Sequence, residues 1–392
     1  MVRRFLAKLA GIGPDFRRML RATLFFGAAA GIFMSTLNNY LSDVHDLGAA
    51  ARGWLELPRE LPGFLIIGVS ALLLTFMRES RMAAVAMVLT ATGAVGLGLV
   101  ARETTPLVVF VVIWSLGDHI IFAVEGPIGL TLAKRGNEGR RLGQLGGARN
   151  LGVILGVAGV YLLAKWFGDR YDLFYGLAAL AAVAAGWNYL RLRVGETAAR
   201  SRRLVWRRKY GIFYAISALF GVRKQIFLAF GGWVLVSLHG VPVSTIALLY
   251  FIAAALGVLF RPLLGDIIDW VGERVVLATD EALLLGICLV YAFVDDVRLL
   301  YGAYVLDSIL FALRIARTTY LKKIADDPAD ITPTISMGIT IDHVVAMSLP
   351  ILSGWLWETY GHQWVFLLAG AIALVGFFIC LRIRVPEPDA TA

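Results

Sequence analysis

The sequence has little charge and almost no cysteine. Of its 392 residues only 17% are charged, whereas 59% are hydrophobic and the mean hydropathy is +0.74. A soluble domain is usually about a quarter charged. The two cysteines, Cys288 and Cys380, fall in apolar runs and show no zinc or disulfide spacing. We therefore expect them to pack as small hydrophobic side chains in a protein whose solvent is mostly lipid.

The sequence is rich in long apolar runs. A helix needs about 20 apolar residues to cross a hydrocarbon layer of about 30 Å. About twelve such runs are joined by short loops, which leaves little room for a soluble domain. The spans that we predict are 22–44, 55–76, 82–100, 106–132, 143–166, 171–191, 210–238, 244–264, 275–294, 299–321, 335–357 and 363–382.

The formal net charge of +9 does not indicate a nucleic-acid partner, because the basic residues are unevenly distributed. With the N-terminus inside and the loops alternating, the inside segments hold 26 of the 37 lysines and arginines. Such asymmetry follows the positive-inside rule. It predicts an integral membrane protein of a bacterial inner (plasma) membrane with cytoplasmic N- and C-termini. The basic N-terminal segment is then a cytoplasmic tail before the first helix rather than a cleaved signal peptide.

One segment divides the chain. Residues 191–209 are strongly basic with a single acidic residue, so they cannot lie in hydrocarbon. We predict that they form a cytoplasmic linker between two six-helix bundles, at 1–190 and 210–392.

The two halves resemble each other in sequence. A shift of 189 residues aligns 118–125 with 307–314 and places Asp118 on Asp307. Internal repeats are typical of secondary transporters, whose binding site lies near the bilayer midplane where the repeats meet.

A loop between the eighth and ninth spans carries a family-like motif. The segment 261–276, RPLLGDIIDWVGERVV, is similar to the loop motif of the major facilitator superfamily. The residues at the motif positions are Gly265, Asp266, Asp269, Gly272 and Arg274. The resemblance implies a cytoplasmic gating motif in which the charges form an ion-pair lock. Glu273 stands where the family commonly has a second basic residue, and the first-half loop keeps only Arg78 and Arg81.

The resemblance in architecture covers nearly the whole chain. It implies an all-α membrane protein with the major facilitator fold, in which twelve transmembrane helices form two pseudo-symmetric six-helix bundles. It also implies that the first, fourth, seventh and tenth helices line a central cavity. The superfamily fold carries very many substrates, so it does not identify the cargo.

Ionisable residues inside spans are energetically expensive and mark solute or ion pathways. The polar residues that we predict to bind solute are Arg223, Lys224, Gln225, Asn38, Asn39 and Arg314. The alternative for the adjacent cations of the seventh span is a structural ion pair with Asp307 or Asp342.

A second set of buried residues is predicted to take part in proton coupling or in ion pairs. Its members are Asp118, Glu125, Arg149, Asp307, Asp342 and His343. A carboxylate in a low-dielectric cavity and a histidine can both exchange protons near neutral pH. Glu125 matches Arg314, and Arg149 matches Asp342, at equivalent places in the two halves. These opposite charges either pair across the bundle interface or neutralise charges within one half.

Three further patterns give weaker expectations. Asp280 and Glu281, near the start of the ninth span, are expected to anchor the adjacent loop. Four charges lie just before or within the start of the second span; they are Arg52, Glu56, Arg59 and Glu60. They could gate the outer face as an ion-pair set, but such charges more often form a solvated loop with snorkelling ends, which the sequence favours here. Glycines at helical spacing in the fifth span predict close helix packing; they are Gly143, Gly147, Gly152 and Gly156.

Together these observations predict a secondary active transporter that moves a small polar, anionic solute by alternating access. Proton coupling, as a symporter or antiporter, is part of that prediction. The alternatives are a drug/proton efflux antiporter and, of another class, a non-transporting membrane receptor or scaffold. The sequence offers no nucleophile–base pair, metal cluster or phosphate loop, so we expect no catalytic residues, no metal and no cofactor. The expected partners are a small-molecule solute, the lipid bilayer and protons, without nucleic acid, and the expected state is a monomer.

Overall fold

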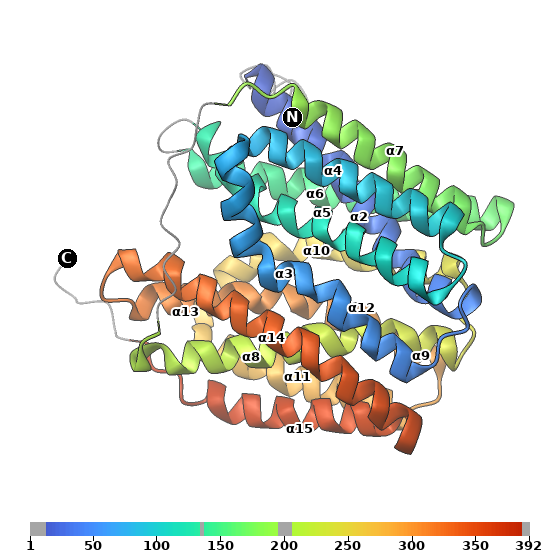
Figure 1. Cartoon of the computed structure of the whole chain (residues 1–392). Helices are drawn as coiled ribbons and strands as arrows, with labels where there is room; N and C mark the ends of the chain where they lie inside the picture. Colours follow the sequence, from blue (N-terminus) through green and yellow to red (C-terminus); the bar gives the residue numbers. More distant parts are fainter. Residues whose placement is uncertain (1–12, 134–136, 195–205, 386–392) are drawn as a thin grey trace. The chain divides into compact units, whose positions relative to one another are not determined.

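The computed structural model describes residues 13–133, 137–194 and 206–385 (Figure 1). Its helices are α2 (Pro14–Asp43), α3 (Ala49–Phe76), α4 (Glu79–Val95), η1 (Gly96–Val100), α5 (Thr104–Thr131), α6 (Glu138–Phe167), α7 (Tyr171–Leu190), η2 (Arg208–Tyr210), α8 (Gly211–Ile226), η3 (Phe227–Gly231), α9 (Gly232–Ser237), α10 (Val243–Val271), α11 (Glu273–Phe293), α12 (Val297–Leu310), η4 (Phe311–Arg314), α13 (Ile315–Ile324), α14 (Pro328–Tyr360) and α15 (His362–Cys380). The start of the predicted basic tail and most of the predicted linker 191–209 lie outside the described residues.

The number of membrane spans agrees with the sequence. Within the described residues, eleven helical stretches are long and apolar enough to cross a bilayer. Helix α3 adds a twelfth as a bent pair, Ala49–Ile66 and Gly68–Phe76, with an angle of 52° between its parts. No strand occurs in this part of the chain. The predicted all-α class with twelve spanning helices is therefore confirmed, and the chain is an integral membrane protein.

The first of two compact units comprises the described residues of Met1–Tyr40, Leu65–Ala199 and Val243–Phe251. In it α4 lies beside α5 and α7 (Figure 1). Its core is a cluster of buried apolar side chains, among them Phe26 and Met87.

Close contact between α2 and α6 depends on glycine in the first unit. A Cβ atom on Gly152 would lie 1.9 Å from the Leu24 carbonyl oxygen, and one on Gly156 would lie 2.3 Å from that of Ala28. The predicted packing role of these two glycines is therefore confirmed. Gly143 and Gly147 have nothing within 4 Å of the same position, so the prediction is wrong for them. Periodicity alone does not say which part of a helix meets its neighbour.

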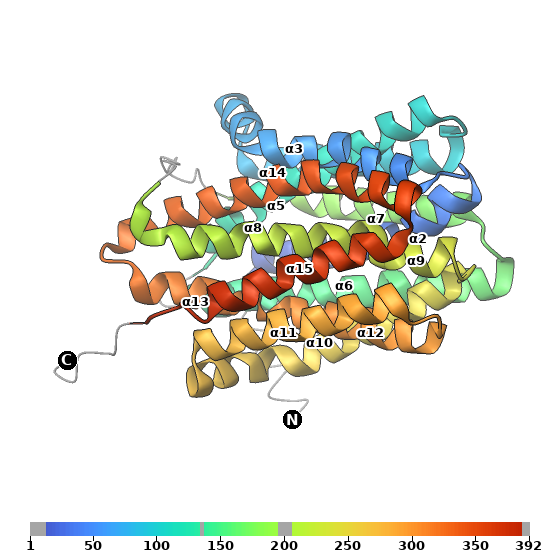
Figure 2. The same cartoon turned by 90° about the horizontal axis from the view of Figure 1, so that it is seen from below.

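The second unit comprises the described residues of Leu41–Phe64, Arg200–Pro242 and Ile252–Ala392. Helices α8, α14 and α15 lie side by side, and α11 packs on α15 (Figure 2). Tyr291 and Phe366 stack in its core with ring centroids 4.7 Å apart, and both cysteines are buried and free. The predicted domain boundaries at 190 and 210 stay predictions.

Two spanning segments of the second unit are not continuous α-helices. The seventh span changes from α8 to the π-helical turn η3 directly after Gln225 and Ile226. The tenth span passes from α12 through the 3-10 turn η4 to α13. Such irregular turns break the regular backbone ladder and are frequent at functional sites in membrane helices.

Candidate functional site

The N-terminal part of α3 carries a buried ion network in the second unit. Glu56 is 0% exposed and accepts bonds from Arg52, Arg59 and Gln225. The Arg59 Nε atom lies 2.7 Å from its carboxylate, and the Arg59 Nη2 atom reaches Glu60 at 2.6 Å. The solvated loop that the sequence favoured here is wrong, because these residues occupy one buried helix face. The spacing i, i+4, i+7 of Arg52, Glu56 and Arg59 was the available signal.

Lys224 extends this network from α8 to α14. Its Nζ atom lies 3.2 Å from the Asp342 carboxylate and 3.9 Å from that of Glu60. Gly221 on α8 makes room for Asp342, because a Cβ there would lie 2.8 Å from the Asp342 Oδ1 atom. Lys224 and Gln225 thus point into one charged cluster with residues of α3 and α14.

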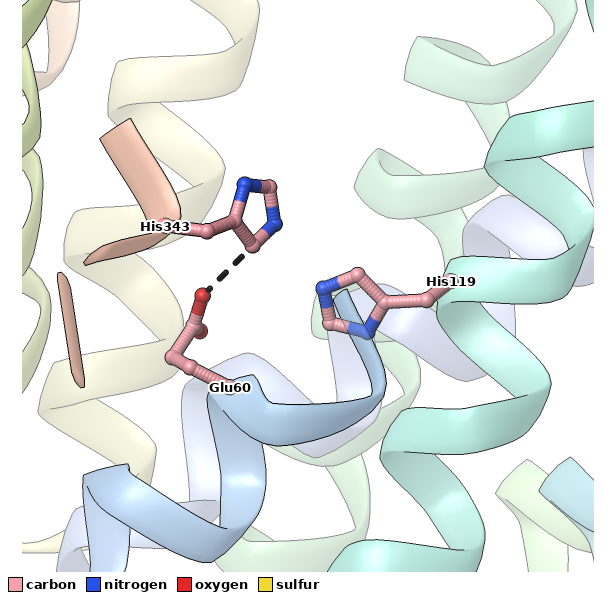
Figure 3. A group of neighbouring side chains, drawn as sticks. All are labelled: Glu60, His119 and His343. Carbon is pink, nitrogen blue, oxygen red and sulfur yellow. Dashed lines mark ion pairs between the residues drawn. The ribbon is translucent and has the colours of Figure 1, made fainter. Parts of the chain in front are cut away.

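His343 stands at the edge of the same network. Its Nε2 atom lies 4.0 Å from the Glu60 carboxylate (Figure 3). Its Nδ1 atom lies 2.9 Å from the Ile339 carbonyl oxygen. A carbonyl can only accept, so Nδ1 carries a proton in that bond. In a neutral ring with that proton, Nε2 is the nitrogen without hydrogen, and it faces a carboxylate.

Arg223 belongs to a separate, tightly bonded triad. Its Nη1 atom lies 2.6 Å from Asp280, and its Nε and Nη2 atoms lie 3.1 and 3.0 Å from Asp307. Asp280 therefore pairs with Arg223 on α8, and the expectation that it anchors the adjacent loop is wrong. The structural pairing of Arg223 with Asp307, given above as the alternative to solute binding, is the arrangement that the geometry favours.

A third cluster lies in the first unit around Glu125 on α5. This carboxylate accepts from Arg149 on α6 and from the Thr23 hydroxyl at 2.8 Å. The Tyr189 hydroxyl lies 3.4 Å away. Arg149 and Glu125 therefore neutralise each other within one half, as Lys224 and Asp342 do in the other.

The remaining predicted residues lie on α2, on α5 and at the turn η4. Asn39 is buried and Asn38 half-buried on α2, and Asp118 is half-buried on α5. Arg314 closes the turn η4, with its guanidinium 5.3 Å from the centre of the Phe311 ring. Their roles stay predictions.

The gating motif spans the junction of α10 and α11. Gly272 has a φ of +82° and joins the two helices, a backbone conformation that glycine adopts without strain. Asp266, Asp269 and Arg274 are exposed. Glu273, which departs from the family pattern, is buried and pairs with Lys323 of α13 at 2.7 Å. The lock itself stays a prediction.

A groove of about 480 Å³ lies between α11 and α15. Its lining is Arg274, Val275, Ala278, Thr279, Ala282, Leu283, Phe377 and Leu381. This mostly apolar lining suits a lipid chain better than a polar solute.

Comparison with solved structures shows which known fold the chain has. No protein-family model matches the sequence, and no curated relative matches it. Solved structures do match. A variant of the nucleoside transporter NupG has a TM-score of 0.79 at 15% identity, over 94% of this chain and 99% of that one.

Two further solved structures give the same result. A D-xylose-proton symporter has a TM-score of 0.70 at 14% identity, over 95% of this chain and 97% of that one. The peptide transporter POT in complex with sulfate has a TM-score of 0.74 at 14% identity, over 94% of both chains. The chain has the major facilitator fold, as its sequence motif implied.

Proposed function

We propose that the protein is a secondary active transporter that moves a small anionic solute by alternating access, together with protons. The fold supports transport, because the solved structures that share it are transporters of nucleosides, sugars and peptides. One of them is named as a proton symporter, and another binds sulfate. The observation that carries the proposal is the buried ion network joining α3, α8 and α14.

The charges of this network are balanced. Three cations face three carboxylates through ion pairs. The cations are Arg52, Arg59 and Lys224, and the carboxylates are Glu56, Glu60 and Asp342. An anion that displaces one carboxylate from its cation leaves that carboxylate uncompensated in a low dielectric. One added proton restores the balance, and His343 offers a site for it beside Glu60.

This balance gives a coupling mechanism. The solute anion binds a cation in or beside the network, and a proton binds His343 Nε2 or the Glu60 carboxylate. The loaded site then carries the same net charge as the empty site, so its helices can move between the two access states at lower electrostatic cost. Without the proton, the bound anion changes the net charge of the buried site and the movement is opposed.

The proposal includes an orientation. The basic inside segments favour cytoplasmic termini in a bacterial inner membrane, and a monomer remains part of the proposal. Cysteines placed in the loops between spans and labelled with an impermeant reagent from outside whole cells test this orientation.

Transport in proteoliposomes tests the function. Purified protein is reconstituted and offered labelled solutes of each charge class: gluconate and lactate, xylose, and choline. We expect uptake of an anionic solute that increases when the outside is more acidic than the lumen. Preference for choline, or an uptake rate that does not respond to the pH gradient, would contradict the proposal.

His343→Gln is expected to uncouple transport from protons. Glutamine keeps a polar side chain but cannot take up a proton at this position. Solute exchange at equal pH should persist, whereas stimulation by an acidic exterior should be largely lost. The matched control is His362→Gln, on another helix of the second unit, which should retain the stimulation. Equal stimulation in His343→Gln and wild type would remove His343 from the mechanism.

A further inference from the structure

Arg317 differs from Arg223 and Arg149, two other arginines within the described spans. Arg223 is bonded by Asp280 and Asp307, and Arg149 by Glu125. Arg317, on α13 three residues after the turn η4, forms no ion pair with a described residue. Asp342 attracts it electrostatically, but that carboxylate is paired with Lys224.

Aromatic rings hold Arg317 instead. Its guanidinium lies 4.8 Å from the centre of the Phe220 ring and 5.9 Å from that of Phe213. Phe220 in turn packs on Phe311 with centroids 4.9 Å apart. A guanidinium over ring faces is stabilised by cation–π attraction, which leaves its N–H groups uncommitted.

Two of those N–H groups have no acceptor. The Nε and Nη1 atoms of Arg317 are buried, and no described residue accepts a hydrogen bond from either. Buried donors without acceptors are costly, above all on a charged group. Arg317 is thus a cation with two buried N–H donors that are available to a ligand.

In the first unit, Arg149 likewise lies over two aromatic rings, but there the protein supplies the carboxylate that pairs with it. The Arg149 guanidinium lies 4.8 Å from the Phe26 ring centre and 4.7 Å from that of Phe122, and Glu125 accepts from it. Around Arg317 the two rings are present, but the described residues supply no carboxylate.

We propose that Arg317 binds the carboxylate of the transported solute. This inference deepens the proposed function and rests on it. The fork of a guanidinium suits a carboxylate, which accepts two parallel hydrogen bonds. A phosphate dianion would keep one of its two negative charges uncompensated beside a single arginine. The rings of Phe213, Phe220 and Phe311 suit a flat or apolar solute body, so the class is an organic monocarboxylate.

The position of Arg317 connects binding with movement. The 3-10 turn η4 lies directly before α13, and a change in this turn would move Arg317 relative to the rings on α8. The two nitrogen atoms are screened from solvent in this conformation, so the solute reaches them when the turn shifts. Discontinuous spanning helices commonly border transporter sites.

Ligand-dependent thermal stability of the purified full-length protein tests this site. The probes are hippurate, its neutral amide hippuramide, benzylamine and inorganic phosphate. The variants are Arg317→Gln and Arg317→Lys, with Arg170→Gln as the control because that arginine is exposed and paired with Asp172. Size-exclusion elution and the melting temperature without ligand show whether each variant folds.

Hippurate should raise the melting temperature of the wild type, and hippuramide and benzylamine should not. Arg317→Gln should weaken hippurate binding about tenfold or more, the loss expected when a charge-assisted bond is removed. Arg317→Lys should bind with intermediate affinity because lysine lacks the fork. Arg170→Gln should bind as the wild type does.

Three results would overturn the assignment: equal stabilisation by hippuramide, wild-type affinity in Arg317→Gln, or no stabilisation by hippurate. Stabilisation by phosphate alone through Arg317 would also overturn it, in favour of a phosphorylated solute. If Arg317→Gln does not fold, the comparison of hippurate with hippuramide and benzylamine on the wild type still shows whether the protein binds a carboxylate, and Arg317→Lys tests the arginine. The proposed function fails separately, if hippurate binds through Arg317 but proteoliposomes take up no solute.

Discussion

Arg223→Gln is expected to destabilise the protein by about 3–5 kcal/mol, the cost of removing one partner from a buried ion pair. Arg223 is 4% exposed and holds Asp280 and Asp307. Without its charge, two carboxylates from α11 and α12 are left close together in a low dielectric. Thermal unfolding in detergent and the yield of monodisperse protein measure the effect.

A compensated variant separates charge from packing. Arg223→Met combined with Asp280→Asn and Asp307→Asn removes all three charges, and it should recover most of the lost stability. The control Arg170→Gln breaks an exposed pair, in which Arg170 is 58% exposed, and should cost less than about 1 kcal/mol.

Arg223→Gln and the compensated variant together also distinguish solute binding by Arg223 from a structural role in the triad. If Arg223→Gln keeps wild-type stability but loses transport, this arginine binds solute and the structural triad is not its main role. If stability falls and the compensated variant transports, the triad is a structural brace.

Gly152→Ala is expected to be the second most disruptive change, because it forces α2 and α6 apart. Its new Cβ would lie 1.9 Å from the Leu24 carbonyl oxygen and 2.9 Å from the Ala28 amide nitrogen. Both are backbone atoms, so no side-chain rotation relieves the contact. Overpacking of this kind costs about 1–3 kcal/mol or more. We expect a lower melting temperature and weaker transport, since Arg149 on α6 would shift from Glu125.

Gly147→Ala is the matched control on the same helix. Nothing lies within 4 Å of its Cβ position, and alanine favours a helix over glycine by about 1 kcal/mol. It should therefore leave stability unchanged or raise it slightly. Equal losses in Gly152→Ala and Gly147→Ala would contradict the packing account.

The fold could be predicted because lipid imposes long apolar helices, which the sequence displays directly. Hydropathy could not show that the charge-rich start of α3 is buried, since its four charges suppress the apolar signal. Their partners Lys224 and Gln225 come from a helix about 165 residues later in the chain. Only the spacing within 52–60 indicated that these charges share one face.

The partners of the charged residues in the candidate site could not be predicted from the sequence either. Arg223, Lys224 and Gln225 are adjacent in sequence, yet Arg223 enters one cluster and the other two enter another, because neighbours on a helix point about 100° apart. Which acid each cation meets depends on how α8 packs against α11, α12 and α14. Arg317 was not among the predicted solute-binding residues, because its aromatic partners Phe213 and Phe220 lie on a different helix.

The central claim is that an anion and a proton cross together through a balanced network. Its most direct measurement is simultaneous recording of solute-induced current and lumenal pH in proteoliposomes, with protein-free liposomes as the blank for passive permeation. The account predicts that an added carboxylate solute acidifies the lumen without net current, and that Arg317→Gln abolishes both uptake and acidification. Entry of negative charge without acidification would contradict it.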